Sequence, residues 1–179
     1  MKKILIISTS LRNKSNSHLL AEEFARGAKE VGNEVELVSL RNAPIAFCRG
    51  CLACQKTGKC VIDDAAVAIA DKMARAEVIV WATPVYYYSV SGQMKTLIDR
   101  ANSLYTRDYN FRSVYLIATA TEDEAFTPEG AEKCVQGWVD CFERAKFEKT
   151  LFVGGVTDPG DVLKKGDLAK AYELGKSVR

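Results

Sequence analysis

Short apolar runs alternate with segments of helical periodicity along the whole chain, and this alternation restricts the fold more than any other feature. Two of the apolar runs are continuous, Ile4–Ile7 and Val78–Ala82. Neither shows the alternation of apolar and polar residues that is typical of a strand with one exposed face. Strands formed by continuous apolar runs are buried on both faces, which is typical of parallel sheets covered by helices. Leu20, Phe24 and Ala28 recur at helical spacing after the first run. The chain is therefore predicted to be an α/β protein.

Five pairs of strand and helix follow one another with short connections, which predicts a doubly wound, five-stranded parallel sheet with helices on both faces. The strand order 2-1-3-4-5 suits such a sheet. Pro84 is expected to stop the third strand at its carboxyl end. We expect strands at 4–7, 34–40, 78–82, 114–118 and 150–153, and helices with apolar stripes at 20–31, 66–73, 94–101, 131–145 and 168–178.

Composition excludes several classes of protein. The 179 residues are 47% hydrophobic and 27% charged, as expected for one soluble globular domain that spans residues 1–179. A net charge of +2 gives no reason to expect nucleic acid or an anionic membrane as a partner. No apolar run approaches the ~20 residues that span a bilayer, and the N-terminus lacks a signal-peptide layout. A cytoplasmic location is therefore expected.

The turn between the first strand and the first helix is rich in groups that bind anions. Hydroxyl and amide side chains, an arginine and the only histidine lie within residues 8–18. Free N–H groups at a helix start, together with the helix dipole, favour a bound anion. The alternative is an ordinary strand-to-helix connection with a Ser or Asn N-cap, in which His18 is a plain helix residue. The predicted phosphate-binding residues are Ser8, Ser10, Arg12, Asn16, Ser17 and His18.

A second polar loop, Thr83–Ser91, follows the third strand, and the order 2-1-3-4-5 brings it beside the first turn at the switch point. The chain has neither a G-x-G-x-x-G fingerprint nor a Walker A motif, so a bound monophosphate is favoured. FMN meets this description, with its ring against the second loop. A partly buried loop or a subunit contact is the alternative for the tyrosines. The predicted residues around the ring are Pro84, Val85, Tyr86, Tyr87 and Ser89, with Thr119 and Thr121 after the next strand.

Two of these segments carry a family resemblance. Ser8–Arg12 with Asn16–Ser17 resembles the GSPR…NT phosphate loop of the NADPH-dependent FMN reductase superfamily, which has a flavodoxin-like fold. Thr83–Tyr87 with Ser89–Arg100 resembles the TPVY…SVSGQLK…LIDR segment of the same superfamily. The two matches extend over about residues 4–100.

The resemblance has consequences and two departures. It implies bound FMN, NAD(P)H as a cosubstrate, a quinone-like or flavin electron acceptor, and a homodimer or homotetramer. The departures are Thr9, which stands where the family has glycine, and Leu11, which stands where it has proline. Neither residue removes the hydrogen-bond donors of the turn, so FMN remains the expected cofactor.

Four cysteines lie in the long stretch 41–62, spaced as Cys48-x2-Cys51-x2-Cys54-x5-Cys60. Thiolates at this spacing can wrap one iron–sulfur cubane. Free thiols, a disulfide or a Cys₄ zinc site are the alternatives. The run resembles that of the iron–sulfur flavoproteins, a branch of the same superfamily with a 4Fe–4S cluster beside FMN. That resemblance implies that all four cysteines are ligands.

We therefore expect an FMN-dependent oxidoreductase in which the flavin carries the chemistry and no side chain need act as an acid or base. With a cluster, the resemblance implies electron transfer between a ferredoxin-like donor, the cluster and FMN. Without one, it implies an NAD(P)H-dependent FMN or quinone reductase. A flavodoxin-like electron carrier without substrate turnover and a zinc-stabilised regulatory module remain as alternatives.

Overall fold

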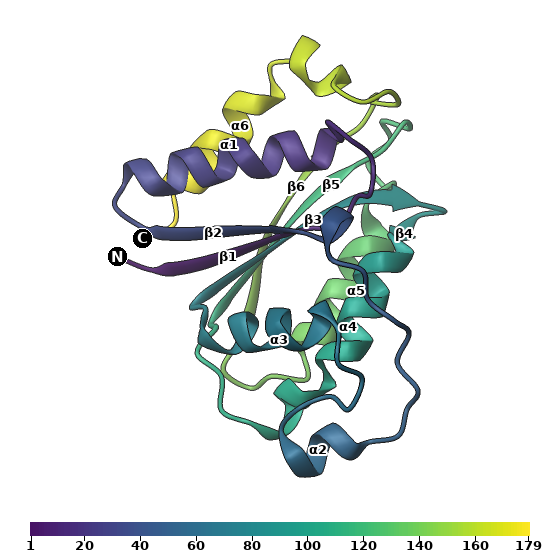
Figure 1. The fold of residues 1–179 in the computed structure, drawn as a ribbon. Coiled ribbons are helices and arrows are strands. Elements are labelled where there is room, and N and C mark those ends of the chain that lie inside the picture. Colours follow the sequence, from purple (N-terminus) through teal and green to yellow (C-terminus); the bar gives the residue numbers. More distant parts are fainter.

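The computed structural model describes residues 1–179 as a sheet between two layers of helices (Figure 1). The strands are β1 Lys3–Ser8, β2 Glu34–Ser39, β3 Val78–Tyr86, β4 Ser89–Val90, β5 Ser113–Thr119 and β6 Lys146–Val153. The α-helices are α1 Asn16–Glu30, α2 Ala53–Thr57, α3 Ala65–Arg75, α4 Gly92–Arg100, α5 Glu129–Val139 and α6 Asp167–Lys176. Three short 3₁₀ helices, η1 Leu40–Asn42, η2 Ala101–Thr106 and η3 Asp161–Lys164, lie in the connections.

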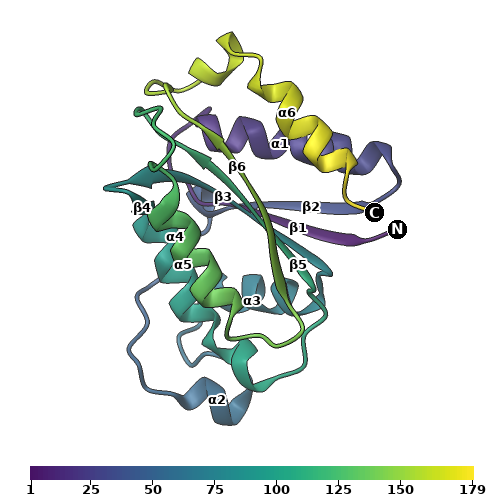
Figure 2. The ribbon, with the colours of Figure 1, turned by 180° about the vertical axis from the view of Figure 1, so that it is seen from behind.

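The main sheet has the order β2-β1-β3-β5-β6, and all its neighbouring strands are parallel. Because β4 only pairs with the end of β3 outside this path, the order is the predicted 2-1-3-4-5 with one added hairpin strand. Helices α1 and α6 cover one face, and α3, α4 and α5 cover the other (Figure 1). Seen from behind, α2 lies beyond α3, on the side away from α1 and α6 (Figure 2). The predicted flavodoxin-like architecture is confirmed.

The apolar runs form two cores, one on each face of the sheet. In β1, Leu5 and Ile7 belong to a cluster of 25 buried residues, on the face that α3, α4 and α5 cover. Ile4 and Ile6 belong to a cluster of 17 buried residues under α1 and α6. Alternate residues of one strand therefore enter opposite cores, as the continuous apolar run predicted.

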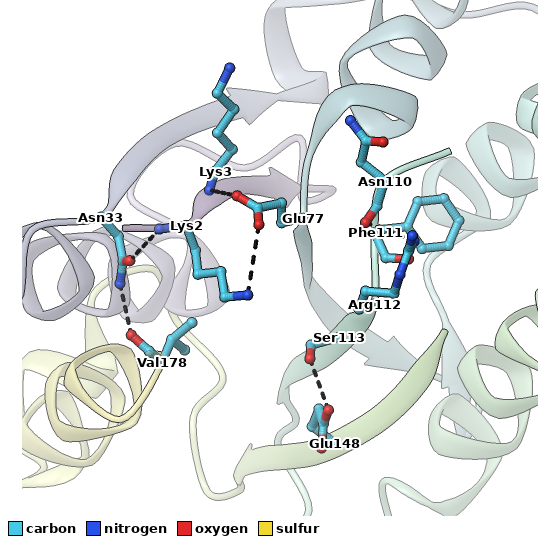
Figure 3. Close-up of polar contacts among 10 residues, drawn as sticks. All are labelled: Lys2, Lys3, Asn33, Glu77, Asn110, Phe111, Arg112, Ser113, Glu148 and Val178. Carbon is cyan, nitrogen blue, oxygen red and sulfur yellow. Dashed lines mark hydrogen bonds and ion pairs between the residues drawn. The ribbon is translucent and has the colours of Figure 1, made fainter. Parts of the chain in front are cut away.

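Polar contacts tie the strands together at their amino ends (Figure 3). Asn33 accepts from the Lys2 N–H at 2.8 Å and donates to the Val178 carbonyl at 2.8 Å, which joins β1 to the C-terminus. Glu77, just before β3, accepts from the Lys3 N–H at 2.9 Å. The amino ends of the strands are therefore closed by polar contacts, and the loops at the opposite, carboxyl ends remain available to form a site.

Strand β3 continues through Pro84 to Tyr86, so the prediction that Pro84 stops the strand is wrong. The reason lies in the neighbouring strand. The Ala82 carbonyl still accepts from the N–H of Thr9, just after β1, and Pro84 points its backbone to the same side two residues later. Because β1 has ended there, the missing N–H of proline costs no ladder bond. On the other side Pro84 stays in register with Thr119 of β5.

The boundary between α5 and β6 also differs from expectation. The predicted stripe continues to Ala145, but α5 ends at Val139. Phe142 is nonetheless buried, because a turn after the helix brings its ring within 5.0 Å of Phe111. Strand β6 then begins at Lys146, four residues before its predicted start. No helix of the protein is both long and apolar enough to cross a bilayer.

Candidate functional site

A cleft with a volume of about 110 Å³ lies at the carboxyl ends of the central strands. Its wall combines the turn after β1, the end of β3, and the loops after β5 and β6. This is the switch point of the sheet, where doubly wound folds bind ligands. The predicted cofactor residues that the structure brings to this wall are Ser10, Arg12, Asn16, Ser17, Pro84, Val85, Tyr86, Thr119 and Thr121.

The other predicted residues lie outside this wall. Ser8 is the buried last residue of β1. The His18 Nε2 atom lies 3.4 Å from Glu22 on the side of α1. Tyr87 is fully exposed at the tip of the β3–β4 hairpin, and Ser89 lies in β4. A phosphate contact by Ser8 or His18, or a ring contact by Tyr87 or Ser89, therefore has no direct support from the cleft geometry.

The start of α1 holds an unpaired hydroxyl on Ser17, a residue that lines the cleft. Ser15 caps the helix, and its hydroxyl accepts from the His18 N–H at 3.3 Å. The hydroxyl of Ser17 is also buried, but it has no hydrogen-bond partner in the protein. A buried polar group without a partner is rare and costly. The unpaired Ser17 hydroxyl beside a helix N-terminus therefore fits a bound anion.

Two predicted phosphate residues also hold the site together. The Asn16 amide donates to the Asp158 carbonyl at 3.0 Å, and its oxygen accepts from the Val162 N–H at 3.1 Å. The Arg12 guanidinium donates to the Thr157 carbonyl at 2.7 Å. Both side chains therefore tie the turn after β1 to the loop after β6. Arg12 keeps further N–H groups free for an anion, whereas Asn16 is largely committed to the protein.

The loop after β6 is the part of the wall that the sequence reasoning missed. Val156, Thr157 and Pro159 line the cleft, and the Thr157 hydroxyl donates to the Thr121 hydroxyl at 3.1 Å. A signal for this loop was present, because Gly154–Gly155 ends the last parallel strand. All carboxyl ends of a parallel sheet meet at one edge, so the residues after this pair had to lie near the switch point.

The turn after β3 is a hairpin rather than an open loop. Tyr87 and Tyr88 form its two-residue turn with φ angles of 47° and 59°, as a type I′ turn requires. Side chains with a Cβ rarely adopt this conformation, so the turn is strained. The Tyr88 hydroxyl donates to Glu122 at 3.3 Å, and its ring lies 6.0 Å from that of Phe126. These contacts hold the hairpin beside the cleft.

A buried hydroxyl pair links the turn after β1 to the start of α4. Thr9 donates its hydroxyl to the Ala82 carbonyl at 3.2 Å and accepts from the Ser91 hydroxyl at 3.0 Å. Ser91 is the N-cap of α4 and also accepts from the Met94 N–H at 3.3 Å. Thr9, which stands where the resembling family has glycine, therefore adds a connection between the turn after β1 and α4.

The four cysteines of the stretch 41–62 line one small cavity between that stretch and the end of α4. The stretch is not wholly irregular, because it contains α2. Cys48 and Cys51 are exposed, Cys54 is buried and Cys60 is half-buried. All four thiols are free, and they do not converge closely enough to form a metal-binding group.

The surroundings of the sulfurs suit thiolates or an iron–sulfur cluster. The Gly50 N–H donates to the Cys48 sulfur at 3.4 Å, and the Asn102 amide donates to the Cys54 sulfur at 3.4 Å. Hydrogen bonds to sulfur are one of the ways in which proteins tune a cluster. Leu52 lies between the cysteines with a φ of 56°, a strained value for a residue with a side chain.

The sheet order and the cleft at its switch point define a flavodoxin-like protein. The fold is also that of a solved structure described as an NAD(P)H:quinone oxidoreductase from Methanothermobacter marburgensis. That structure superposes with a TM-score of 0.80 over 98% of this chain and 95% of its own, at 16% sequence identity. At this identity, the likeness shows the fold alone.

Sequence comparison is more specific. The family model for NADPH-dependent FMN reductase matches residues 2–132, so the chain belongs to that family. An iron–sulfur flavoprotein from Methanosarcina thermophila is 32% identical over 158 residues, which cover 87% of this chain and 82% of the relative. One from Archaeoglobus fulgidus is 38% identical over 111 residues, 62% of this chain and about half, 54%, of the relative. Within the family, the chain falls in the iron–sulfur flavoprotein branch.

Proposed function

We propose that this protein is an FMN-dependent oxidoreductase that carries a 4Fe–4S cluster on Cys48, Cys51, Cys54 and Cys60. The observation that carries the proposal is the placement of all four cysteines around one cavity, with N–H donors aimed at two of the sulfurs. Family membership supports the flavin, and two of the relatives are named iron–sulfur flavoproteins.

The cleft supports FMN through its own residues. The unpaired Ser17 hydroxyl and the start of α1 would hold the phosphate, together with Ser10 and the free N–H groups of Arg12. Pro84–Tyr86 would lie along the ring. Bound FMN supplies hydride or single-electron transfer, and these residues bind and orient it.

The electron partners follow from the two cofactors. A cluster passes one electron at a time, which suits a ferredoxin-like donor, whereas NAD(P)H delivers a hydride directly to a flavin. A quinone-like compound or a flavin is the proposed acceptor. A homodimer or homotetramer would complete the open side of the cleft, where Tyr86 is half-exposed.

A cluster-free NAD(P)H-dependent reductase is the second candidate. Free thiols at the four cysteines are the state that this candidate requires. The two candidates differ in which electron donor reduces the flavin rapidly. Rapid reduction of the flavin by NADPH alone supports the second candidate, and reduction by a ferredoxin through the cluster supports the first.

Single cysteine variants test the cluster. Cys60→Ser, prepared without oxygen, should lose most of its iron and acid-labile sulfide but keep its FMN. Cys141→Ser is the matched control, because Cys141 is an exposed free cysteine outside the cavity of the four. It should keep wild-type iron and FMN. Equal iron content in Cys60→Ser and the wild type would refute the proposed ligand set.

A further inference from the structure

Arg100, the last residue of α4, has a buried charge that the proposed function leaves unexplained. Its side chain is 0% exposed. Burying a guanidinium is costly unless the surrounding groups pair with it. Arg100 also ends the Leu97–Arg100 segment, which resembles the family but contacts no part of the flavin cleft.

The guanidinium of Arg100 joins both ends of the cysteine stretch. One of its nitrogens, Nη1, donates to the Ala46 carbonyl at 2.7 Å, just before the first cysteine. The other, Nη2, donates to the Ile62 carbonyl at 2.9 Å, just after the last cysteine. Both nitrogens also donate to Asp64, at 2.7 and 2.8 Å. A single planar fork therefore closes the stretch that carries the four cysteines.

Asp64 extends this closure to the backbone. Its carboxylate accepts from the Ala46 N–H at 2.8 Å and, as the N-cap of α3, from the Ala66 N–H at 3.0 Å. Burial alone would raise the pKa of Asp64, but the hydrogen bonds from Arg100 and these two N–H groups hold it below its ordinary value. The carboxylate of Asp64 therefore accepts from the guanidinium and from two backbone N–H groups.

Arg100 also faces the sulfurs. It lines the cavity of the four cysteines. Its Nε–H is buried and has no partner in the protein. Asn102, two residues further on, is the donor to the Cys54 sulfur. The end of α4 and the start of η2 therefore bring a guanidinium to the cavity wall and an amide N–H to one of the four sulfurs.

We propose that Arg100 is a positioning residue for the cysteine stretch, and that it raises the reduction potential of the cluster held there. The second part rests on the proposed function. Reduction adds negative charge to the cluster, and a guanidinium on the wall of its cavity stabilises that charge. The first part concerns only the order of the cysteine stretch and holds with or without a cluster.

Three variants separate these parts. Arg100→Lys keeps the charge but loses the fork and the Nε–H. The double variant Asp64→Asn/Arg100→Gln removes both charges together, so that no unpaired charge stays buried. Arg107→Lys is the matched control, because Arg107 forms an ion pair with Asp71 at 2.6 Å and bonds the Gly58 carbonyl inside the cysteine stretch, but contacts neither end of that stretch.

The reduction potential of the cluster is measured by anaerobic spectroelectrochemical titration. The iron content of each protein sample is determined beforehand. We expect a lower cluster midpoint potential in Arg100→Lys and in the double variant. In the double variant the loss of the Arg100 charge outweighs that of Asp64, because Arg100 lines the cavity whereas Asp64 does not. Arg107→Lys should leave the potential unchanged. An unchanged potential in the double variant at full iron content would refute the electrostatic part.

The order of the stretch is read on metal-free protein, by the rate at which iodoacetamide alkylates Cys54 and Cys60. We expect several-fold faster alkylation in both Arg100 variants than in the wild type and in Arg107→Lys. Equal rates would refute the positioning role. A wild type without iron would instead refute the proposed cluster, and the alkylation rates would still decide the role of Arg100.

Discussion

Substitution of Ser17 should weaken FMN binding without destabilising the protein. The Ser17 hydroxyl is buried beside the cleft without a protein partner. Ser17→Ala removes that unpaired group, so the free energy of unfolding of the FMN-free protein should stay within ~0.5 kcal/mol of the wild type or rise slightly. Affinity for FMN should fall, because a hydrogen bond to a charged phosphate contributes about 1.5–3 kcal/mol, which corresponds to roughly a 10- to 150-fold higher Kd.

Ser15→Ala is the matched control on the same turn. The Ser15 hydroxyl caps α1 through the His18 N–H at 3.3 Å, so its loss should cost about 1 kcal/mol of stability. For a chain of this size, that cost lowers Tm by roughly 2–4 °C. Stability is measured by urea unfolding of FMN-free protein, and affinity by quenching of flavin fluorescence.

Riboflavin, which lacks the phosphate, completes the test. Ser17→Ala should bind riboflavin as the wild type does, because the lost contact is to the phosphate. The reasoning is refuted if Ser17→Ala destabilises the FMN-free protein as much as Ser15→Ala while the Kd for FMN is unchanged. That outcome would make Ser17 a structural residue of α1.

Three further predictions concern the scaffold. Ser91→Ala removes the N-cap of α4 and the hydrogen bond to Thr9, and should cost about 1–2 kcal/mol in urea unfolding. Tyr87→Gly relieves a φ of 47° at a fully exposed residue and should stabilise by about 1 kcal/mol, whereas Tyr88→Gly also loses the contact with Glu122 and should gain less. Asp64 has a lowered pKa in the folded state, so its contribution is present above about pH 4 and is lost as pH falls through the folded pKa. The stability difference between the wild type and Asp64→Asn, measured from about pH 6 to 3, should therefore shrink toward acid pH; a constant difference would contradict this.

The central sheet could be predicted because its strands are buried on both faces. Residues Ile4–Ile7 pack alternately into the two cores, so burial on both faces is directly visible in the sequence as a continuous apolar run. Strand β6 lies at the sheet edge, where Glu148 and Lys149 are exposed and interrupt that pattern. Pro84 was misjudged because its effect depends on where β1 ends, which is a property of the neighbouring strand.

The candidate site could be predicted only in part, because the roles of some of its residues depend on segments that are distant in the sequence. The residue types in the turns after β1 and β3 predicted an anion site, and the structure places most of them on one cleft wall. What Asn16 does there depends on the loop after β6, more than a hundred residues away in the sequence. The role of Arg100 was equally hidden, because its partners come from both ends of the cysteine stretch.

The cofactor content of protein purified without oxygen tests the central claim most directly. An FMN-dependent oxidoreductase with a cluster on the cysteine stretch should contain about one FMN, four irons and four acid-labile sulfides per chain. Its visible spectrum should combine flavin bands with broad cluster absorption that bleaches on reduction. Stoichiometric FMN with neither iron nor sulfide would contradict the cluster, and protein that binds no FMN at all would contradict the whole account.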